Sequence, residues 1–205
     1  MINKICIAIC LLVFILISID FVHADTINIL QQRLNKLHSF HANFHQKVIS
    51  QNNSTIQEGD GYVLVEKPNR LLWHMRVPSE NVLISDGHTI WAYTPCIEQV
   101  SIYSMNKNIY STPLILIACN EIRYWKQYNI SKKGNNFSFI PRKSLNNIKK
   151  FTINISKNGI INMFRIIEKD DVCVLYTLSK QKINPISSEK FHFVIPYGVT
   201  VDDQR

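Results

Sequence analysis

The stretch FHANFHQKV, residues 40–48, alternates apolar and polar side chains almost without a break, and this alternation decides the fold class. A period of two sends successive side chains to opposite faces of an extended chain, so the stretch predicts a half-buried strand. Residues 71–77 (LLWHMRV) repeat the pattern. Further runs typical of strands are 82–85, 89–93, 98–101, 125–131, 137–141, 151–155, 161–168, 174–179 and 190–195.

Turn-forming residues separate these runs, and Asn158-Gly159 is the most specific of them because Asn-Gly suits a two-residue hairpin turn. Many strands joined by short turns predict an antiparallel meander. A mature chain of this size is long enough for one such domain, which we expect to span residues 25–205. The predicted turns are Gly59-Asp60-Gly61, Lys67-Pro68-Asn69, Asp86-Gly87, Gly134-Asn135, Asn158-Gly159 and Asp170-Asp171.

Two segments depart from the strand pattern. In residues 26–38, apolar side chains recur at spacings of 3, 4 and 3, which predicts an amphipathic helix resting on another layer. In residues 112–118, Thr112 is a good N-cap, Pro113 is tolerated in the first turn, and the rest is apolar on all sides. A sheet covers one side of such a helix, so either more protein or an apolar ligand must cover the rest.

The start of the chain predicts export. Lys4 precedes an apolar run over residues 5–19, and Val22-His23-Ala24 suits signal peptidase, so we expect a signal peptide over 1–24. The run is shorter than the ~20 residues that span a bilayer. Cys10 follows Ile9 rather than a small residue, so we expect no lipid anchor.

Composition and motifs argue against several functions. The net charge is +8, but the basic residues are scattered, so we expect no nucleic-acid binding. The histidines, including His41 and His45, lack the spacing of metal ligands, so we expect no metal. No G-x-S-x-G, H-E-x-x-H or Gly-rich dinucleotide motif occurs, so we expect neither catalysis nor a cofactor. Three cysteines remain after export and are interpreted as small buried hydrophobes: Cys96, Cys119 and Cys173.

A set of short stretches runs in order through the whole mature chain. They are 40–42, 46–48, 57–59 with Gly61, 67–69, 73–75, 83–87 (LISDG), 91–93, 98–99, 112–113, 116–118, 127–130, 151–154 and 198–205. No single stretch is decisive, but the ordered set resembles the LolA family of outer-membrane lipoprotein carriers.

The resemblance implies an unclosed antiparallel β-barrel covered by a lid of short helices, as in LolA and LolB. It implies a monomer in the periplasm, without catalysis or cofactor, whose hydrophobic cavity holds the acyl chains of lipoproteins. The cargo would come from the inner-membrane LolCDE complex and pass to the outer-membrane receptor LolB.

Residues for the cavity and its lid follow from this reading, although ordinary core packing remains the alternative for each of them. Those expected on the concave side are Leu34, Leu37, Phe44, Val48, Leu71, Trp73, Met75, Leu83, Trp91, Leu114, Ile115 and Ile117.

Lys67 stands where the family usually has an arginine that latches the lid by donating to backbone carbonyls in the empty state. Lysine keeps the charge but lacks the planar fork of donors, so we expect a looser empty state. Lys67→Leu should then change cargo release. The alternative is an exposed turn lysine. Cys96 and Cys119 also depart from the family pattern, where a bulky apolar residue and a polar residue are expected.

Two other functions stay open. One is a membrane-anchored receptor resembling LolB, which an N-terminal lipid would reveal. The other is a soluble binder of free lipid or fatty acid, which would fail to release lipoproteins from inner-membrane vesicles. The basic charge is either complementary to acidic partners or a product of codon drift.

Overall fold

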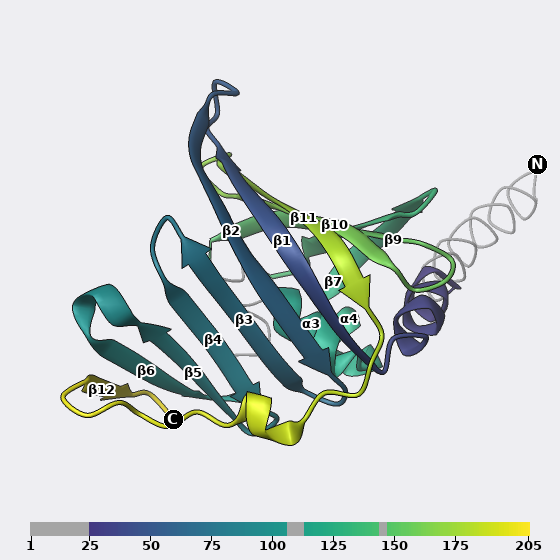
Figure 1. The fold of residues 1–205 in the computed structure, drawn as a ribbon. Helices are drawn as coiled ribbons and strands as arrows, with labels where there is room; N and C mark the ends of the chain where they lie inside the picture. Colours follow the sequence, from purple (N-terminus) through teal and green to yellow (C-terminus); the bar gives the residue numbers. More distant parts are fainter. Residues whose placement is uncertain (1–24, 106–112, 144–146) are drawn as a thin grey trace, which may run out of the picture.

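The computed structural model describes residues 25–105, 113–143 and 147–205, and these form one curved sheet around short helices (Figure 1). The described strands follow the order β12-β6-β5-β4-β3-β2-β1-β11-β10-β9-β8-β7. All neighbours are antiparallel except β12 and β6. The order ends at β12 and β7, which do not pair, so the predicted fold class of an unclosed antiparallel barrel is confirmed. The strands are β1 (Ser39–Ile49), β2 (Thr55–Glu66), β3 (Arg70–Val77), β4 (Asn81–Asp86), β5 (Thr89–Thr94), β6 (Gln99–Ser104), β7 (Tyr128–Lys133), β8 (Asn136–Pro141), β9 (Ile148–Ile155), β10 (Ile161–Glu168), β11 (Cys173–Lys182) and β12 (Thr200–Asp203).

β1 lies in the middle of the sheet, and its alternation sets the two faces. Phe40, Ala42 and Phe44 are buried on the concave side, called here the inner face, while His41 and His45 lie on the outer face. Phe44 pairs with Gly61 of β2 and with Leu178 of β11. The strand predicted from residues 40–48 is therefore confirmed.

In the described part of the chain, three helical segments cover the inner face: residues 25–35 (the N-terminal helix), α3 (Pro113–Cys119) and α4 (Ile122–Trp125). The apolar stripe predicted for residues 26–38 is fully buried, but the helix ends at residue 35 and a turn follows. Arg33 holds this helix against the sheet by donating to the carbonyl of Ile155 (2.7 Å) and to Asn135 Oδ1 (2.9 Å). The helix thus sits at the end of the sheet where the β7–β8 and β9–β10 turns lie.

A second, smaller core lies on the outer face. Leu72, Ile84 and Phe191 form its centre, and Trp91 and Phe193 pack against it. Phe191 ends the 3-10 helix η3 (Ser188–Phe191), which belongs to the segment joining β11 to β12. This segment crosses the outer face of β3 and β4, so part of the sheet is buried on both sides.

Several predicted strand boundaries were wrong. Residues 190–195 form no strand, because Phe191 and Phe193 insert into the outer core from η3 and irregular chain. The edge strand lies further on, as β12. The strand predicted from residue 125 begins at Tyr128, since Trp125 ends α4. A second 3-10 helix, η1 (Pro95–Ile97), joins β5 to β6.

The predicted turn Gly59-Asp60-Gly61 was also wrong, because these residues lie inside β2. A Cβ on Gly61 would lie 2.2 Å from the carbonyl oxygen of His74 and 2.4 Å from Phe44 Cζ. Glycine is needed there for the close approach of Phe44, and no turn is involved. The other predicted turns all connect neighbouring strands.

The predicted signal peptide over residues 1–24 and the predicted N-cap Thr112 lie outside the described residues. Of the helices in the described part of the chain, none has the length and apolar character needed to cross a membrane.

Candidate functional site

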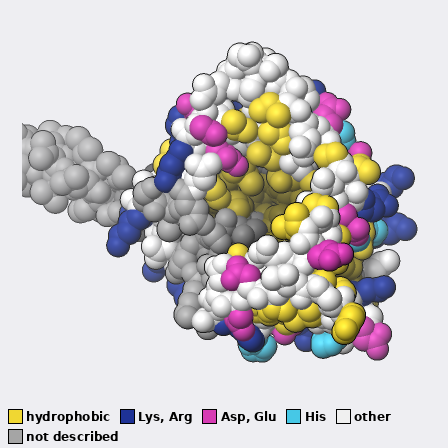
Figure 2. Space-filling view, turned by 90° about the vertical axis from the view of Figure 1, so that its left-hand side faces the viewer, with side chains coloured by type: hydrophobic (Ala, Val, Ile, Leu, Met, Phe, Trp, Pro, Cys, Tyr) yellow, Lys and Arg dark blue, Asp and Glu magenta, His cyan; other side chains and the backbone are white. Residues whose placement is uncertain are grey.

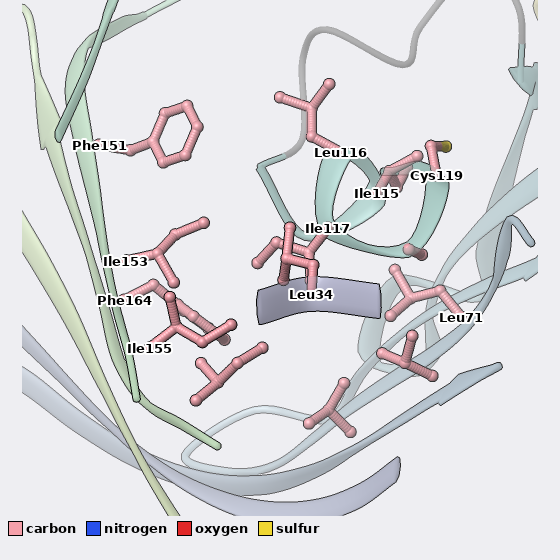
Figure 3. Packing of buried hydrophobic residues seen from close by; sticks show 14 of the residues in the cluster. Leu34, Leu71, Ile115, Leu116, Ile117, Cys119, Phe151, Ile153, Ile155 and Phe164 are labelled. Carbon is pink, nitrogen blue, oxygen red and sulfur yellow. The ribbon is translucent and has the colours of Figure 1, made fainter. Parts of the chain in front are cut away.

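α3 is apolar on every side, and the protein itself covers most of it. Every residue of the helix is buried except Leu114, which is half-buried. Figure 3 shows Leu116 of α3 facing Phe151 and Ile153 of β9, with Leu34 of the N-terminal helix beneath Ile117. Ordinary core packing therefore surrounds the middle and the Cys119 end of the helix.

The Pro113 end of α3 lines a cavity of about 360 Å³. Figure 2 shows a hollow in this side of the molecule whose interior is largely hydrophobic. The walls come from α3, from β3 and β4 on one side of β1, and from β9, β10 and β11 on the other side. These two sets of strands are called here the two halves of the sheet. The lining residues are Trp73, Leu83, Pro113, Leu114, Asn147, Ile148, Phe164, Ile166, Glu168 and Tyr176.

Four aromatic rings form the floor between the two halves of the sheet. Phe44 and Trp73 stack with their ring centroids 3.7 Å apart, and Tyr176 meets Trp73 edge to face at 4.9 Å. Phe164 lies 5.6 Å from Tyr176 and 6.1 Å from Trp73. Interlocked rings of this kind hold one geometry, so the floor keeps its shape when the contents of the cavity change.

Three of the residues expected in the cavity line it: Trp73, Leu83 and Leu114. Another seven join the hydrophobic cluster beneath it, called here the inner core: Leu34, Leu37, Phe44, Leu71, Met75, Ile115 and Ile117. Val48 shares the inner face of β1 with Phe44, but it is half-buried and outside this core.

The placement of Trp91 on the concave side was wrong. Its neighbour Ile90 is the residue of β5 that enters the inner core, and strand alternation sends Trp91 to the outer face. There it lies 6.2 Å from Phe193, measured between ring centroids. Ile90 and Trp91 are both apolar because the inner core buries one face of β5 and the segment after β11 covers the other.

Sequence reasoning missed the part of the lining that lies beyond β1. Ile148, Phe164, Ile166 and Tyr176 come from β9, β10 and β11, on the far side of β1 from Trp73. The runs that hold them were predicted as strands, and Phe164 and Ile166 share one face of such a run. The missing information was that β11 pairs with β1, which brings this face opposite β3.

The turn between β2 and β3 contacts both covering helices. Lys67 Nζ donates to the carbonyl of Leu34 in the N-terminal helix, and the Lys67 amide donates to the carbonyl of His38 (2.9 Å). The Asn69 amide donates to the carbonyl of Ala118 in α3 (3.4 Å). Burial without a carboxylate partner lowers the pKa of Lys67 to about 8. Lys67 is therefore a partly buried donor to a helix carbonyl.

Asn120 joins the ends of the three helical segments. Its side chain donates to Asn35 Oδ1 (2.7 Å) and accepts from Trp125 Nε1 (3.1 Å). Its carbonyl accepts from Gln31 Nε2 (3.0 Å). Asn120 has a φ of +47°, a left-handed conformation that asparagine tolerates better than most residues.

The cysteines do not all follow the prediction of burial. Cys119 and Cys173 are buried, whereas Cys96 is exposed, and all three thiols are free. Burial, with the charge of Glu121 adding to it, raises the pKa of the Cys119 thiol to about 12. Within the described ranges, no cluster of three or more His, Cys, Asp or Glu side chains is arranged to hold a metal ion.

Comparison with known proteins identifies the family. The family model described as outer membrane lipoprotein carrier protein LolA matches residues 35–194. The chain belongs to the LolA family. A relative in this family, the outer-membrane lipoprotein carrier protein of Erwinia tasmaniensis, is 47% identical over 89% of this chain and 90% of its own length. The carrier protein of Cronobacter sakazakii is 44% identical over 92% of both chains.

Solved structures resemble this chain in fold alone. An uncharacterized conserved protein of Thermus thermophilus has a TM-score of 0.56 at 11% identity, covering 86% of this chain and 98% of that one. A DUF1329 family protein of Desulfovibrio piger has a TM-score of 0.50 at 8% identity, with 83% and 97% covered.

Proposed function

We propose that this chain is a periplasmic carrier that shields the acyl chains of outer-membrane lipoproteins in the cavity beneath α3. Its relatives are named outer-membrane lipoprotein carrier proteins, and the family match covers most of the chain. The observation that carries the proposal is the apolar cavity between the aromatic floor and the Pro113 end of α3. The working unit would be residues 25–205, acting as a monomer and without catalysis.

Acyl chains need such a shelter because each buried methylene contributes about 0.8 kcal/mol, so an acylated anchor does not cross water unaided. The cavity of about 360 Å³ is near the lower end of the range of about 300–1,000 Å³ for small-molecule sites. An anchor with several acyl chains needs more room. Loading would therefore displace α3 from the inner core and expose the predicted residues beneath it, including Leu71 and Met75.

The partners implied by the family are the inner-membrane LolCDE complex as donor and the outer-membrane receptor LolB as acceptor. Passive transfer to a receptor requires that the carrier bind its cargo less favourably than the receptor does. A lid that packs on the inner core in the empty state suits this requirement. When the acyl chains leave, α3 regains its contacts with the inner core, and these contacts offset part of the free energy lost when the cargo leaves the cavity.

Lys67 would act as the latch of the empty state. Its Nζ binds the carbonyl of Leu34, so it holds the N-terminal helix, while the neighbouring Asn69 amide holds α3. A single ammonium makes this latch weaker than a bidentate guanidinium would. Lys67→Leu should change the rate of cargo transfer, with Lys67→Arg as the matched variant that restores the fork.

The function is tested by release of a triacylated lipoprotein from inner-membrane vesicles that contain the donor complex. The wild type should bring the lipoprotein into the soluble fraction as a one-to-one complex. Leu114→Glu places a charge in the cavity and should reduce release at least about tenfold, since burying an unpaired charge is costly. Ile140→Glu, on a half-exposed side chain of β8, is the matched control and should behave as the wild type.

The two alternatives give different results in the same assay. A soluble binder of free lipid would leave the lipoprotein in the membrane pellet. An anchored receptor would carry a lipid on its own N-terminus, which mass spectrometry of the exported protein detects. Either outcome would contradict the carrier function.

A further inference from the structure

Three polar side chains belong to the lining of the otherwise apolar cavity. Asn147 precedes β9, Glu168 ends β10, and Tyr176 lies in β11. The other lining residues are hydrophobic, and among the described residues the lining includes no Lys, Arg or His. An apolar cavity with a few convergent polar groups uses those groups to orient its ligand and select its chemistry.

Within the described residues, the hydroxyl of Tyr176 donates no hydrogen bond. Its ring is fixed by contacts with Phe44, Trp73 and Phe164, whose centroids lie 4.9–5.7 Å away. No hydrogen bond ties the hydroxyl to any residue that the structure describes. Burial, followed by the charge of Glu168, raises the pKa of Tyr176 to about 12, so the hydroxyl keeps its proton near neutral pH.

Among the described lining residues, Glu168 supplies the negative charge. Its Oε2 accepts a hydrogen bond from Asn147 Nδ2 (2.6 Å), which fixes the carboxylate at the rim of the cavity. A free fatty acid entering with its carboxylate beside Glu168 would meet a like charge, and the described lining residues offer it no cation. An ester carbonyl is neutral and only accepts hydrogen bonds, so it suits the donor on Tyr176.

We propose that Tyr176 and Glu168, which line the same cavity, select esterified acyl chains and reject free fatty acids. Tyr176 would donate to an ester carbonyl, and Glu168 would accept from a neighbouring hydroxyl or amide N–H of the same ligand. The inference rests on the proposed carrier function and adds to it the chemical group that the cavity recognises. Such selectivity would keep the carrier from being occupied by fatty acids shed from membranes.

The test compares monopalmitoylglycerol with palmitate, which carry the same acyl chain and differ in the head. Each displaces a fluorescent acyl probe from the full mature chain at a pH where palmitate is ionised. The wild type should bind the ester at least about tenfold more tightly than the acid, a difference of about 1.4 kcal/mol.

Two isosteric variants separate the two roles. Tyr176→Phe keeps the ring contacts and should weaken binding of the ester by about threefold to tenfold, the usual worth of one hydrogen bond, while leaving the acid unaffected. Glu168→Gln keeps an acceptor for Asn147 but removes the charge, and it should strengthen binding of palmitate at least about threefold. The matched controls are Tyr197→Phe and Glu189→Gln, on exposed side chains outside the cavity.

A release assay with the triacylated lipoprotein distinguishes this inference from the proposed function. If the wild type solubilises the lipoprotein but binds palmitate as tightly as the ester, or binds neither, the selectivity is wrong and the carrier function stands. An unchanged ratio of the two affinities in both variants also overturns the inference. If the lipoprotein stays in the membrane while the ester is preferred, the carrier function fails and the selectivity survives.

Discussion

At its Cys119 end α3 is tied to the molecule by hydrogen bonds, whereas its Pro113 end borders the cavity. The carbonyl of Ala118 accepts from the Asn69 amide, and Asn120 links the helix to Trp125 and Asn35. At the other end Pro113 and Leu114 face the hydrophobic lining. The Cys119 end is buried and hydrogen-bonded, while Leu114 is the one residue of α3 that is only half-buried.

The difference matters because an acyl chain can replace apolar contacts but cannot replace hydrogen bonds. An acyl chain can take over the apolar contacts of the Pro113 end with little net change, since apolar contacts are non-directional. It cannot replace the hydrogen bonds at the Cys119 end, where each buried group left without a partner costs about 1–3 kcal/mol. If α3 is the lid of the proposed carrier, this difference predicts that it turns about its Cys119 end and returns to the same place.

The largest effect should come from truncating the packed side of α3. Leu116 is fully buried in the inner core, so Leu116→Ala should lower the free energy of unfolding by about 3 kcal/mol. Leu114→Ala makes the same change two residues earlier, on the cavity side of α3. It should lower the free energy of unfolding by less than about 1 kcal/mol. Urea unfolding of both variants measures the two values. Equal losses would show that the cavity side of α3 is packed as tightly as the side that faces the inner core.

Local sequence patterns predicted which side chains of a single strand or helix are buried. The alternation of residues 40–48 and the apolar stripe of the N-terminal helix identify buried side chains such as Phe44 and Leu34, because a strand or helix has few ways to orient them. The all-apolar composition of α3 likewise predicted a helix covered on all sides.

Contacts between distant segments decided the rest. Trp91 and Ile90 are both apolar, and only the segment that carries Phe191 and Phe193 explains why Trp91 faces outward. In the sequence alone, Gly61 indicates a turn. The structure shows instead that the ring of Phe44 occupies the space where a Cβ of residue 61 would lie. Tyr176 enters the cavity because β11 pairs with β1, a contact across more than a hundred residues that no local period encodes.

A smaller effect is expected at Lys67, which ties the turn next to the anchored end. Its pKa falls from 10.5 in the unfolded chain to about 8 in the folded one, because burial penalises the charged form. Between these values the unfolded state binds more protons, so stability should rise with pH across this window. Between pH 8 and pH 10.5, the free energy of unfolding of the wild type should rise by about 1–2 kcal/mol relative to that of Lys67→Met.

Lys67→Arg is the control for this pH dependence, because arginine stays charged throughout the window and should show no such rise. Urea unfolding at a series of pH values, compared among the three proteins, supplies the measurement. A wild type whose stability parallels that of Lys67→Arg would mean that the lysine is solvated rather than buried against the carbonyl of Leu34.

The smallest effect, a change in labelling rate, reports directly on the anchored end of α3. Cys119 is buried with a raised pKa, so in the native protein it should react with a thiol reagent far more slowly than the exposed Cys96. Asn120→Gly keeps the left-handed backbone but removes the links to Asn35 and Trp125, and it should speed labelling of Cys119 several-fold. Asn53→Gly, at a left-handed turn residue far from α3, should leave the rate unchanged. If a bound acyl ligand speeds labelling of Cys119 as much as Asn120→Gly does, the whole helix leaves its site on loading, and the turning of α3 about a fixed end is wrong.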